Sequence, residues 1–200
     1  MAGTPQIMEL QRQLGFTGKD VDGKRGPKTD AAILAAADAG RLTVAPPLVV
    51  ITAPGADSDI PAAGVEKLKG VHNVLTGIVH EAAIRCDVPF TVIEGLRSRD
   101  RQAQLVKAGA SKTSNSRHLT GHAVDLWPLD PVTGKTLPSD AAFPPGSIAA
   151  KAASARLWSD LRRIAAVIKA VARDRGVLIE WGGDWGWDAP HFQLPRKAYP

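Results

Sequence analysis

Segments with β-forming character are short in this chain, and helical or loop sequence separates them. Residue patterning predicts strands at 90–94 (FTVIE), 123–127 (AVDLW), 177–181 (VLIEW) and 191–194 (HFQL). Helical periodicity predicts a helix from residue 64 to about residue 82, a shorter one that ends at Gly109, and a long amphipathic helix over 154–174. Strands that do not alternate regularly with helices indicate an α+β fold rather than a parallel βαβ repeat.

Composition places the chain among ordinary globular proteins. Of its 200 residues, 44% are hydrophobic and 22% are charged, which suits one medium domain with or without a small one. The formal charge of +5 favours a polyanionic partner, and nucleic acid, anionic lipid and bacterial cell-wall polymer all qualify. Cys86 is the only cysteine, so a metal site has to be built from histidines and carboxylates.

The N-terminal third differs from the rest in its patterning. Residues 5–14 and 27–39 read as two short helices, and residues 43–63 are rich in Pro, Ala and Gly, as a linker is. We therefore expect a small helical module at 1–42, a linker at 43–63 and a compact domain at 64–200. A helical pair that packs on the main domain is the alternative. Neither a signal peptide nor a membrane span is expected, so the chain is predicted to be soluble, without membrane insertion, and monomeric.

The stretch SRHLTGHAVDLW (116–127) gathers His118, His122 and Asp125 within a few positions. Gly121 breaks the stretch, so His118 is expected on an irregular approach and Asp125 on the strand that follows. Strand alternation places Asp125 on the same face as Trp127. A carboxylate beside a tryptophan on a half-buried face is costly unless it is paired or bound to a cation. A metal site, an acid–base pair and an ordinary polar strand all remain open from this stretch alone.

A second dense stretch is WGGDWGWDAPHFQL (181–194), with three tryptophans, two aspartates and a histidine. Pro190 excludes a regular helix, so a loop carries Asp188 and a strand begins at His191. Two histidines and one carboxylate with an open fourth position are typical of a catalytic zinc site. The absence of thiolates suits Zn²⁺, with Mn²⁺, Co²⁺ and Fe²⁺ as alternatives.

These motifs resemble those of a known family. S-x-H-x6-D at 116–125, D-x-x-H at 188–191, EGLRSRDRQ (94–102) and WGGDW (181–185) are similar to blocks of the D-alanyl-D-alanine carboxypeptidase and L-alanyl-D-glutamate endopeptidase family of zinc peptidases. Phage endolysins that cleave L-Ala–D-Glu bonds of peptidoglycan look closest. The resemblance covers about residues 64–194 and implies a small antiparallel sheet with flanking helices, as in hedgehog domains.

The resemblance also implies roles for individual residues. It assigns one zinc ion to His118, Asp125 and His191, the catalytic base to Asp188, and transition-state stabilisation to Arg97. Zinc lowers the pKa of bound water to about 7, and a carboxylate near a ligand can take up the proton. Supporting roles, as hydrogen-bonding, pocket-rim or cleft residues, are expected for Ser116, Gln102, His122, Asp184 and Trp185. Asp184 is the rival base, although its position between glycine and tryptophan favours a turn.

The stretch LQRQLGF…DVDGKRGPKTDAAI, within residues 5–42, resembles a small peptidoglycan-binding domain of cell-wall hydrolases, without that domain's third helix. The match rests on Asp22, Gly23, Gly26, Pro27 and Thr29.

The predicted function is that of an endolysin-type peptidoglycan hydrolase that cleaves the L-Ala–D-Glu bond. It would be made in a host cytoplasm and released to the cell wall. The alternatives are a D-Ala–D-Ala carboxypeptidase and a non-catalytic wall-binding protein, against which the presence of Asp188 argues. A nucleic-acid partner rests on charge alone and is not expected. The Pro- and Gly-rich segment 127–153 is expected to form part of the cleft wall.

Overall fold

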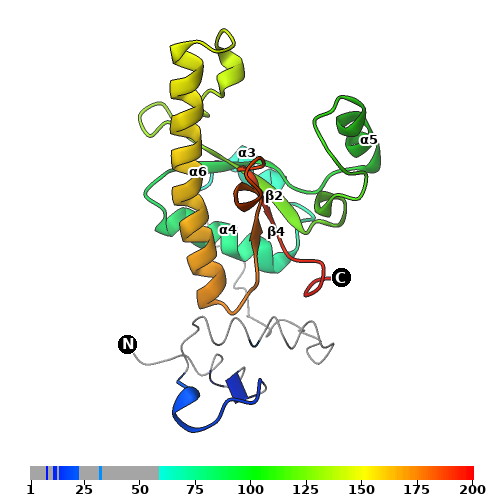
Figure 1. Cartoon of the computed structure of the whole chain (residues 1–200), viewed down its shortest axis with the longest axis vertical. Helices are drawn as coiled ribbons and strands as arrows, with labels where there is room; N and C mark the ends of the chain where they lie inside the picture. Colours follow the sequence, from blue (N-terminus) through cyan, green and yellow to red (C-terminus); the bar gives the residue numbers. More distant parts are fainter. Residues whose placement is uncertain (1–7, 9–10, 13, 23–31, 33–58) are drawn as a thin grey trace. The chain divides into compact units, whose positions relative to one another are not determined.

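A computed structural model of the chain describes residues 8, 11–12, 14–22, 32 and 59–200 (Figure 1). The chain divides into two compact units, and the larger, within residues 51–171 and 179–194, carries all four strands of the sheet. Within the described residues, no helix is long and apolar enough to span a bilayer.

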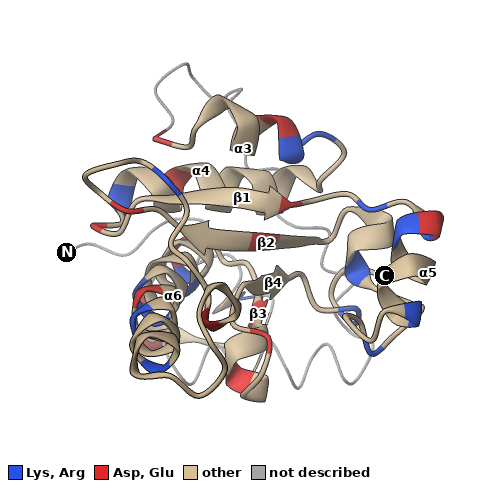
Figure 2. Cartoon of the chain, turned by 90° about the horizontal axis from the view of Figure 1, so that it is seen from above, with Lys and Arg blue, Asp and Glu red and all other residues tan. Residues whose placement is uncertain are grey.

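The larger unit is built on a four-stranded antiparallel sheet in the order β1-β2-β4-β3 (Figure 2). The strands are β1 (Phe90–Glu94), β2 (Ala123–Pro128), β3 (Glu180–Trp181) and β4 (His191–Gln193). In the pairing of β2 with β4, Asp125 lies directly opposite His191. The expected α+β class with a small antiparallel sheet is confirmed.

Besides the sheet, the described residues form four α-helices and four short 3₁₀ helices. The α-helices are α3 (Ala62–Lys67), α4 (Asn73–Arg85), α5 (Arg99–Lys107) and α6 (Ile148–Asp174). The 3₁₀ helices are η1 (Gly18–Asp20), η2 (Arg117–Thr120), η3 (Asp140–Ala142) and η4 (Gly182–Trp185). Helices α5 and α6 lie on opposite sides of the sheet region in both overall views (Figures 1 and 2).

Apolar side chains from α4, α6 and the sheet form the core. The largest fully buried ones include Ile78 of α4, Ile164 of α6 and Phe192 of β4. Burial of side chains of this size stabilises each by roughly 1.5–3 kcal/mol relative to exposure. The core therefore fixes the central strands β2 and β4, on which two of the candidate metal ligands lie.

Four local expectations differ from the structure. The helix expected from residue 64 to about residue 82 is divided into α3 and α4, because the chain turns between them at Gly70, whose φ is +77°. The long helix begins at Ile148 rather than at residue 154, because the hydroxyl of Ser147 accepts a hydrogen bond from Ala150 N at 3.1 Å and caps the alanine-rich turn that follows. The strand expected at 177–181 is reduced to Glu180–Trp181, since its partner β4 offers only three residues. His118 was expected on an irregular approach but lies in the 3₁₀ helix η2.

The predicted N-terminal features fall mostly outside the described residues. This is so for most of the helices at 5–14 and 27–39, for the linker up to residue 58, and for Gly23, Gly26, Pro27 and Thr29. Asp22 is described, and its Oδ1 accepts a hydrogen bond from Gln11 Nε2 at 2.8 Å. The wall-binding module and the domain boundaries stay predictions.

Candidate metal centre

Three neighbouring elements bring His118, Asp125 and His191 together. His118 lies in η2, and Gly121 (φ +69°) turns the chain from η2 into β2, which carries Asp125. The antiparallel register then sets His191 of β4 opposite Asp125. One ligand-type atom from each of the three residues lies within 4.8 Å of the others.

The spacing of these atoms suits a small tetrahedral cation. His118 Nε2 lies 3.2 Å from both Asp125 Oδ1 and His191 Nδ1, and the third separation, His191 Nδ1 to Asp125 Oδ1, is 3.1 Å. Ligands of a tetrahedral zinc ion at about 2.0–2.1 Å are separated by roughly 3.3 Å. The three residues therefore fit one ion and leave a fourth position for water or substrate.

Hydrogen bonds behind the histidines determine which nitrogen faces the centre. His118 Nδ1 lies 2.7 Å from the carbonyl oxygen of Gly95, which can only accept, so Nδ1 carries the proton and Nε2 keeps its lone pair. His191 Nε2 lies 3.0 Å from Gln193 Oε1, and Gln193 Nε2 in turn donates to Glu180 Oε2. That second bond orients the amide so that its oxygen accepts from His191, which leaves His191 Nδ1 free to bind a cation.

The electrostatics of the centre match these assignments. Burial would raise the pKa of Asp125, but hydrogen bonds to His118 and His191 outweigh burial and hold that pKa well below its ordinary value. Burial opposes protonation of His191, yet the hydrogen bond and charge of Asp125 raise the pKa of its imidazole. When no cation is bound, the Asp125 carboxylate favours a proton on His191. A bound divalent ion would replace that proton.

Arg97 lies behind Asp125 in a network of fixed contacts. Its Nε and Nη2 donate to the two carboxylate oxygens of Glu94 at 2.9 and 2.6 Å, and its Nη1 donates to Gln102 Oε1 at 2.6 Å. Its Nη2 also lies 3.6 Å from Asp125 Oδ2. The side chain of Arg97 is buried, so these contacts hold the guanidinium in one orientation beside the centre.

Asp188 approaches the same centre from the loop before β4. Asp188 N donates to the carbonyl of Gly182 at 3.3 Å, and the carbonyl of Asp188 accepts from His191 N at 3.1 Å. Burial raises the pKa of the Asp188 carboxyl, which also feels the charges of His191, Asp125 and Arg97. A carboxyl with a raised pKa beside a metal centre suits general acid–base chemistry.

Two exposed tryptophans lie next to each other, and one of them, Trp185, lies beside the candidate ligand His191. The rings of Trp185 and His191 have centroids 5.6 Å apart, and Trp185 and Trp187 lie 5.8 Å apart. Lys112 Nζ lies 3.8 Å from the centroid of the Trp187 ring. Trp181, in contrast, is buried and donates its indole N–H to the carbonyl of Ala189 at 2.7 Å.

The other predicted site residues divide into two groups. Ser116 and Gln102 support the centre: Ser116 Oγ accepts from His118 N at 3.3 Å, and Gln102 contacts Arg97. His122 and Asp184 point to other partners. The Nδ1 of His122 lies 2.9 Å from Thr120 Oγ1, and both carboxylate oxygens of Asp184 accept from Lys169 Nζ.

Three supporting residues were not singled out from the sequence. Glu94 was quoted only as part of a motif, yet it orients Arg97. Gln193 and Glu180 orient His191. Alternation along β4 places Gln193 on the face of His191, so this signal was present in the sequence.

Comparisons with known proteins agree with this geometry. A family model described as phage L-alanyl-D-glutamate peptidase matches residues 60–140, and one described as D-alanyl-D-alanine carboxypeptidase matches residues 109–194. An L-alanyl-D-glutamate peptidase of Listeria phage A118 is 32% identical over 114 residues, which is 56% of this chain and 32% of that protein. The match thus spans about a third of that curated relative.

A solved structure resembles the chain over most of its own length. The crystal structure of the Serratia marcescens L-Ala D-Glu endopeptidase ChiX is 38% identical, with a TM-score of 0.56, and the alignment covers 70% of this chain and 91% of that one. Identity and coverage of this extent, together with the converging His118, Asp125 and His191, place the chain in the L-alanyl-D-glutamate peptidase family.

Proposed function

We propose that this chain is an endolysin-type peptidoglycan hydrolase that cleaves the L-Ala–D-Glu bond of stem peptides. The proposal rests chiefly on the convergence of His118, Asp125 and His191 in a chain related to L-alanyl-D-glutamate peptidases. We further propose that these residues hold one zinc ion and that the chain acts as a monomer on the bacterial cell wall. Bound zinc supplies the Lewis acidity that makes water a competent nucleophile near pH 7.

Asp188 acts as the general base in this proposal. Its carboxylate takes the proton of the attacking water and later delivers it to the nitrogen of the leaving D-Glu. Burial raises the pKa of Asp188, which brings the carboxyl closer to the pH at which it can both accept and donate. Asp188 is anchored through the backbone to Gly182 and His191, so its distance from the centre is constrained.

Arg97 supplies fixed positive charge beside the reacting carbonyl. Glu94 and Gln102 hold its guanidinium in place, and its Nη2 lies 3.6 Å from Asp125 Oδ2. A preorganised cation stabilises developing negative charge without reorganisation during the reaction. The same contact orients Asp125 so that Oδ1 faces the two histidines.

Mass spectrometry of purified sacculi digested by the wild type tests the proposal. The expected products carry a new N-terminal D-Glu, and His118→Ala and Asp188→Ala are expected to release none of them. His122→Ala is the matched histidine control and is expected to keep activity, because its ring contacts Thr120 and His72 and His122 is not among the three converging residues.

The alternatives give different results in the same digest. Release of free D-Ala would identify a D-Ala–D-Ala carboxypeptidase, which the match over 109–194 brings into consideration. Binding to sacculi without released peptide would identify a non-catalytic wall-binding protein.

A further inference from the structure

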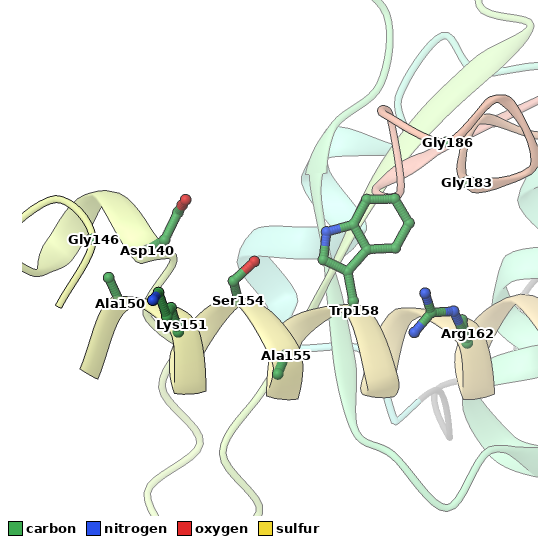
Figure 3. Close-up of a pocket in the computed structure, with 10 residues that line it drawn as sticks. All are labelled: Asp140, Gly146, Ala150, Lys151, Ser154, Ala155, Trp158, Arg162, Gly183 and Gly186. Atoms are coloured by element: carbon green, nitrogen blue, oxygen red, sulfur yellow. The ribbon is translucent and has the colours of Figure 1, made fainter. Parts of the chain in front are cut away.

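A groove lies outside the metal centre, along the first half of α6. Its volume is about 800 Å³, within the range of ligand sites, which runs to roughly 1,000 Å³. Its lining comes from α6, from the segment between η3 and α6, from Asp140 of η3, from Gly183 of η4 and from Gly186, which follows η4. Figure 3 shows Ser154, Trp158 and Arg162 rising from the same side of α6, with Gly183 and Gly186 on the loop beyond the indole ring.

Two cations of α6 that have no carboxylate partner among the described residues line the groove. Along residues 148–171, all of which the structure describes, Arg156, Arg163 and Lys169 form ion pairs with aspartates. Lys151 and Arg162 form none there, and both line the groove. Against these two cations the lining holds one carboxylate, that of Asp140, so its net charge is positive and favours a ligand that carries negative charge.

Trp158 gives the groove a flat apolar surface. The indole is half-buried, and Arg162 Cζ lies 5.3 Å from its centroid. Across from it, Gly186 leaves open space where a side chain would stand, since a Cβ there would meet no atom within 4 Å. An indole face opposite bare backbone suits a ring that presents an apolar face of C–H groups, and the chair of a pyranose presents such a face.

The groove is linked to the metal centre through η4. Gly183 and Gly186 line the groove, while Trp185 between them lies against His191, with 5.6 Å between the ring centroids. A polymer in the groove would therefore be separated from the candidate metal centre only by the short segment from Gly183 to Gly186. From Lys151 to Arg162, the helix extends over roughly 16 Å, at about 1.5 Å per residue, enough for more than one sugar ring.

We infer that this groove binds the glycan strand of peptidoglycan, to which the cleaved stem peptide is attached. An N-acetylated amino sugar stacks on Trp158, and the Ser154 hydroxyl and the Asp140 carboxylate hydrogen-bond to its hydroxyl and amide groups. Arg162, beside Trp158, donates to oxygens of the same sugar, and Lys151 faces carboxylates of neighbouring stems. The inference rests on the proposed hydrolase function and adds a binding site for the sugar part of the substrate. The groove then contributes to affinity for substrates that carry sugar, and the metal centre performs the chemistry.

Kinetics on two soluble substrates test the inference. One is a free stem tetrapeptide that contains the L-Ala–D-Glu bond, and the other is the same peptide on its N-acetylglucosamine–N-acetylmuramic acid disaccharide. Trp158→Ala is expected to lower kcat/KM about tenfold on the disaccharide peptide, through KM, because the contact is made equally in ground and transition states. Arg162→Ala is expected to lower it about three- to tenfold, since a charge-assisted contact is lost. Neither change should alter kcat/KM on the free peptide.

Three controls separate the possible outcomes. Arg163→Ala removes a cation from the same helix that is paired with Asp87 and does not line the groove, so it should leave both substrates unaffected. Trp158→Phe keeps an aromatic face and should retain most of the affinity, and unchanged activity on the free peptide shows that each variant is folded. The inference would be overturned if Trp158→Ala and Arg162→Ala kept the kcat/KM of the wild type on the disaccharide peptide. It would also be overturned if they lowered kcat/KM equally on both substrates. Failure of the wild type to cleave either substrate would instead overturn the proposed function.

Discussion

At the scale of single residues, the two histidines use different nitrogens because different groups lie behind them. His118 presents Nε2 because the carbonyl of Gly95 binds its Nδ1, and His191 presents Nδ1 because Gln193 binds its Nε2. Removing one of these supports should change metal affinity without removing a ligand. The two histidines therefore offer a direct test of how much the supporting hydrogen bonds contribute.

Gln193→Leu is expected to weaken zinc binding by about 10- to 100-fold, because His191 loses the acceptor that fixes its orientation and tautomer. Competition with a chromophoric chelator measures this affinity. Gln104→Leu, on the exposed side of α5, is the matched control and should bind zinc as the wild type does. Equal affinities of the two variants would show that Gln193 does not support the ligand.

Asp188→Asn is expected to lower kcat/KM by about 10²- to 10⁴-fold, because the amide cannot accept the proton of the attacking water. Zinc affinity should stay unchanged, since Asp188 is not among the three converging residues. Loss of zinc binding in this variant would assign Asp188 to the metal ligands instead.

The pH dependence of the wild type follows from the same residue. The base must be deprotonated to act, so activity should fall as pH falls through the pKa of Asp188. Burial raises that pKa, so the decline should begin at a higher pH than for an ordinary carboxyl. The pH profile of kcat/KM measures this, and a decline at the ordinary carboxyl pKa or below would contradict it.

At the same scale, the sequence identified the three converging ligand-type residues but not the residues that orient their neighbours. The zinc set came from spacing combined with family resemblance, and the structure brings its three members together. Glu94, Gln193 and Glu180 were missed because a glutamine or glutamate on a half-buried face is common, and only its partner reveals its role. Asp184, in contrast, was singled out from the sequence, but its carboxylate pairs with Lys169 of α6. Spacing along the chain does not reveal such a partner.

At the scale of elements, the turn from η2 into β2 controls the placement of His118 and Asp125. Gly121 caps η2 with a φ of +69°, and its carbonyl accepts a hydrogen bond from His72 N at 2.7 Å. A Cβ at this position would press into the carbonyl oxygen of Gly70. Both the backbone conformation and the close approach require glycine here.

Gly121→Ala is therefore expected to reduce the free energy of unfolding by more than about 2 kcal/mol, the sum of left-handed strain and a backbone clash. Gly134→Ala is the matched control: Gly134 has a φ of +66° but nothing within 4 Å of its Cβ, so only strain of roughly 1–2 kcal/mol applies. Urea denaturation measures both values. Equal losses in the two variants would show that the contact with Gly70 contributes nothing.

The elements were predictable to the extent that their signals are local. β1 was predicted at the residues where it occurs, because FTVIE is bounded by clear turn sequence. β3 was overestimated because VLIEW has strand propensity throughout, whereas strand length depends on its partner β4. The start of α6 was placed too late because the cap at Ser147 lies within a Pro- and Gly-rich stretch.

At the scale of the whole molecule, the candidate metal centre connects distant parts of the chain. His118 and His191 are separated by 73 residues, and Asp125 lies on a third element between them. An ion bound by all three links η2, β2 and β4, so binding should stabilise the folded state. Because the unfolded chain does not hold the three residues together, most of the binding free energy contributes to folding.

Zinc is therefore expected to raise the melting temperature of the wild type at pH 7. At a free concentration about 100 times Kd, the stabilisation is about 2.7 kcal/mol, which corresponds to a rise of roughly 5–10 °C for a domain of this size. His118→Ala should lose most of this rise, whereas His122→Ala should keep it, because His122 contacts Thr120 and His72. The rise should shrink as pH falls through the pKa of His191, which the hydrogen bond and charge of Asp125 raise against the effect of burial, because protonation of this imidazole competes with the metal. Differential scanning calorimetry with and without zinc measures this rise for each variant. If His118→Ala and His122→Ala lost the rise equally, the assignment of His118, and not His122, as a zinc ligand would be contradicted.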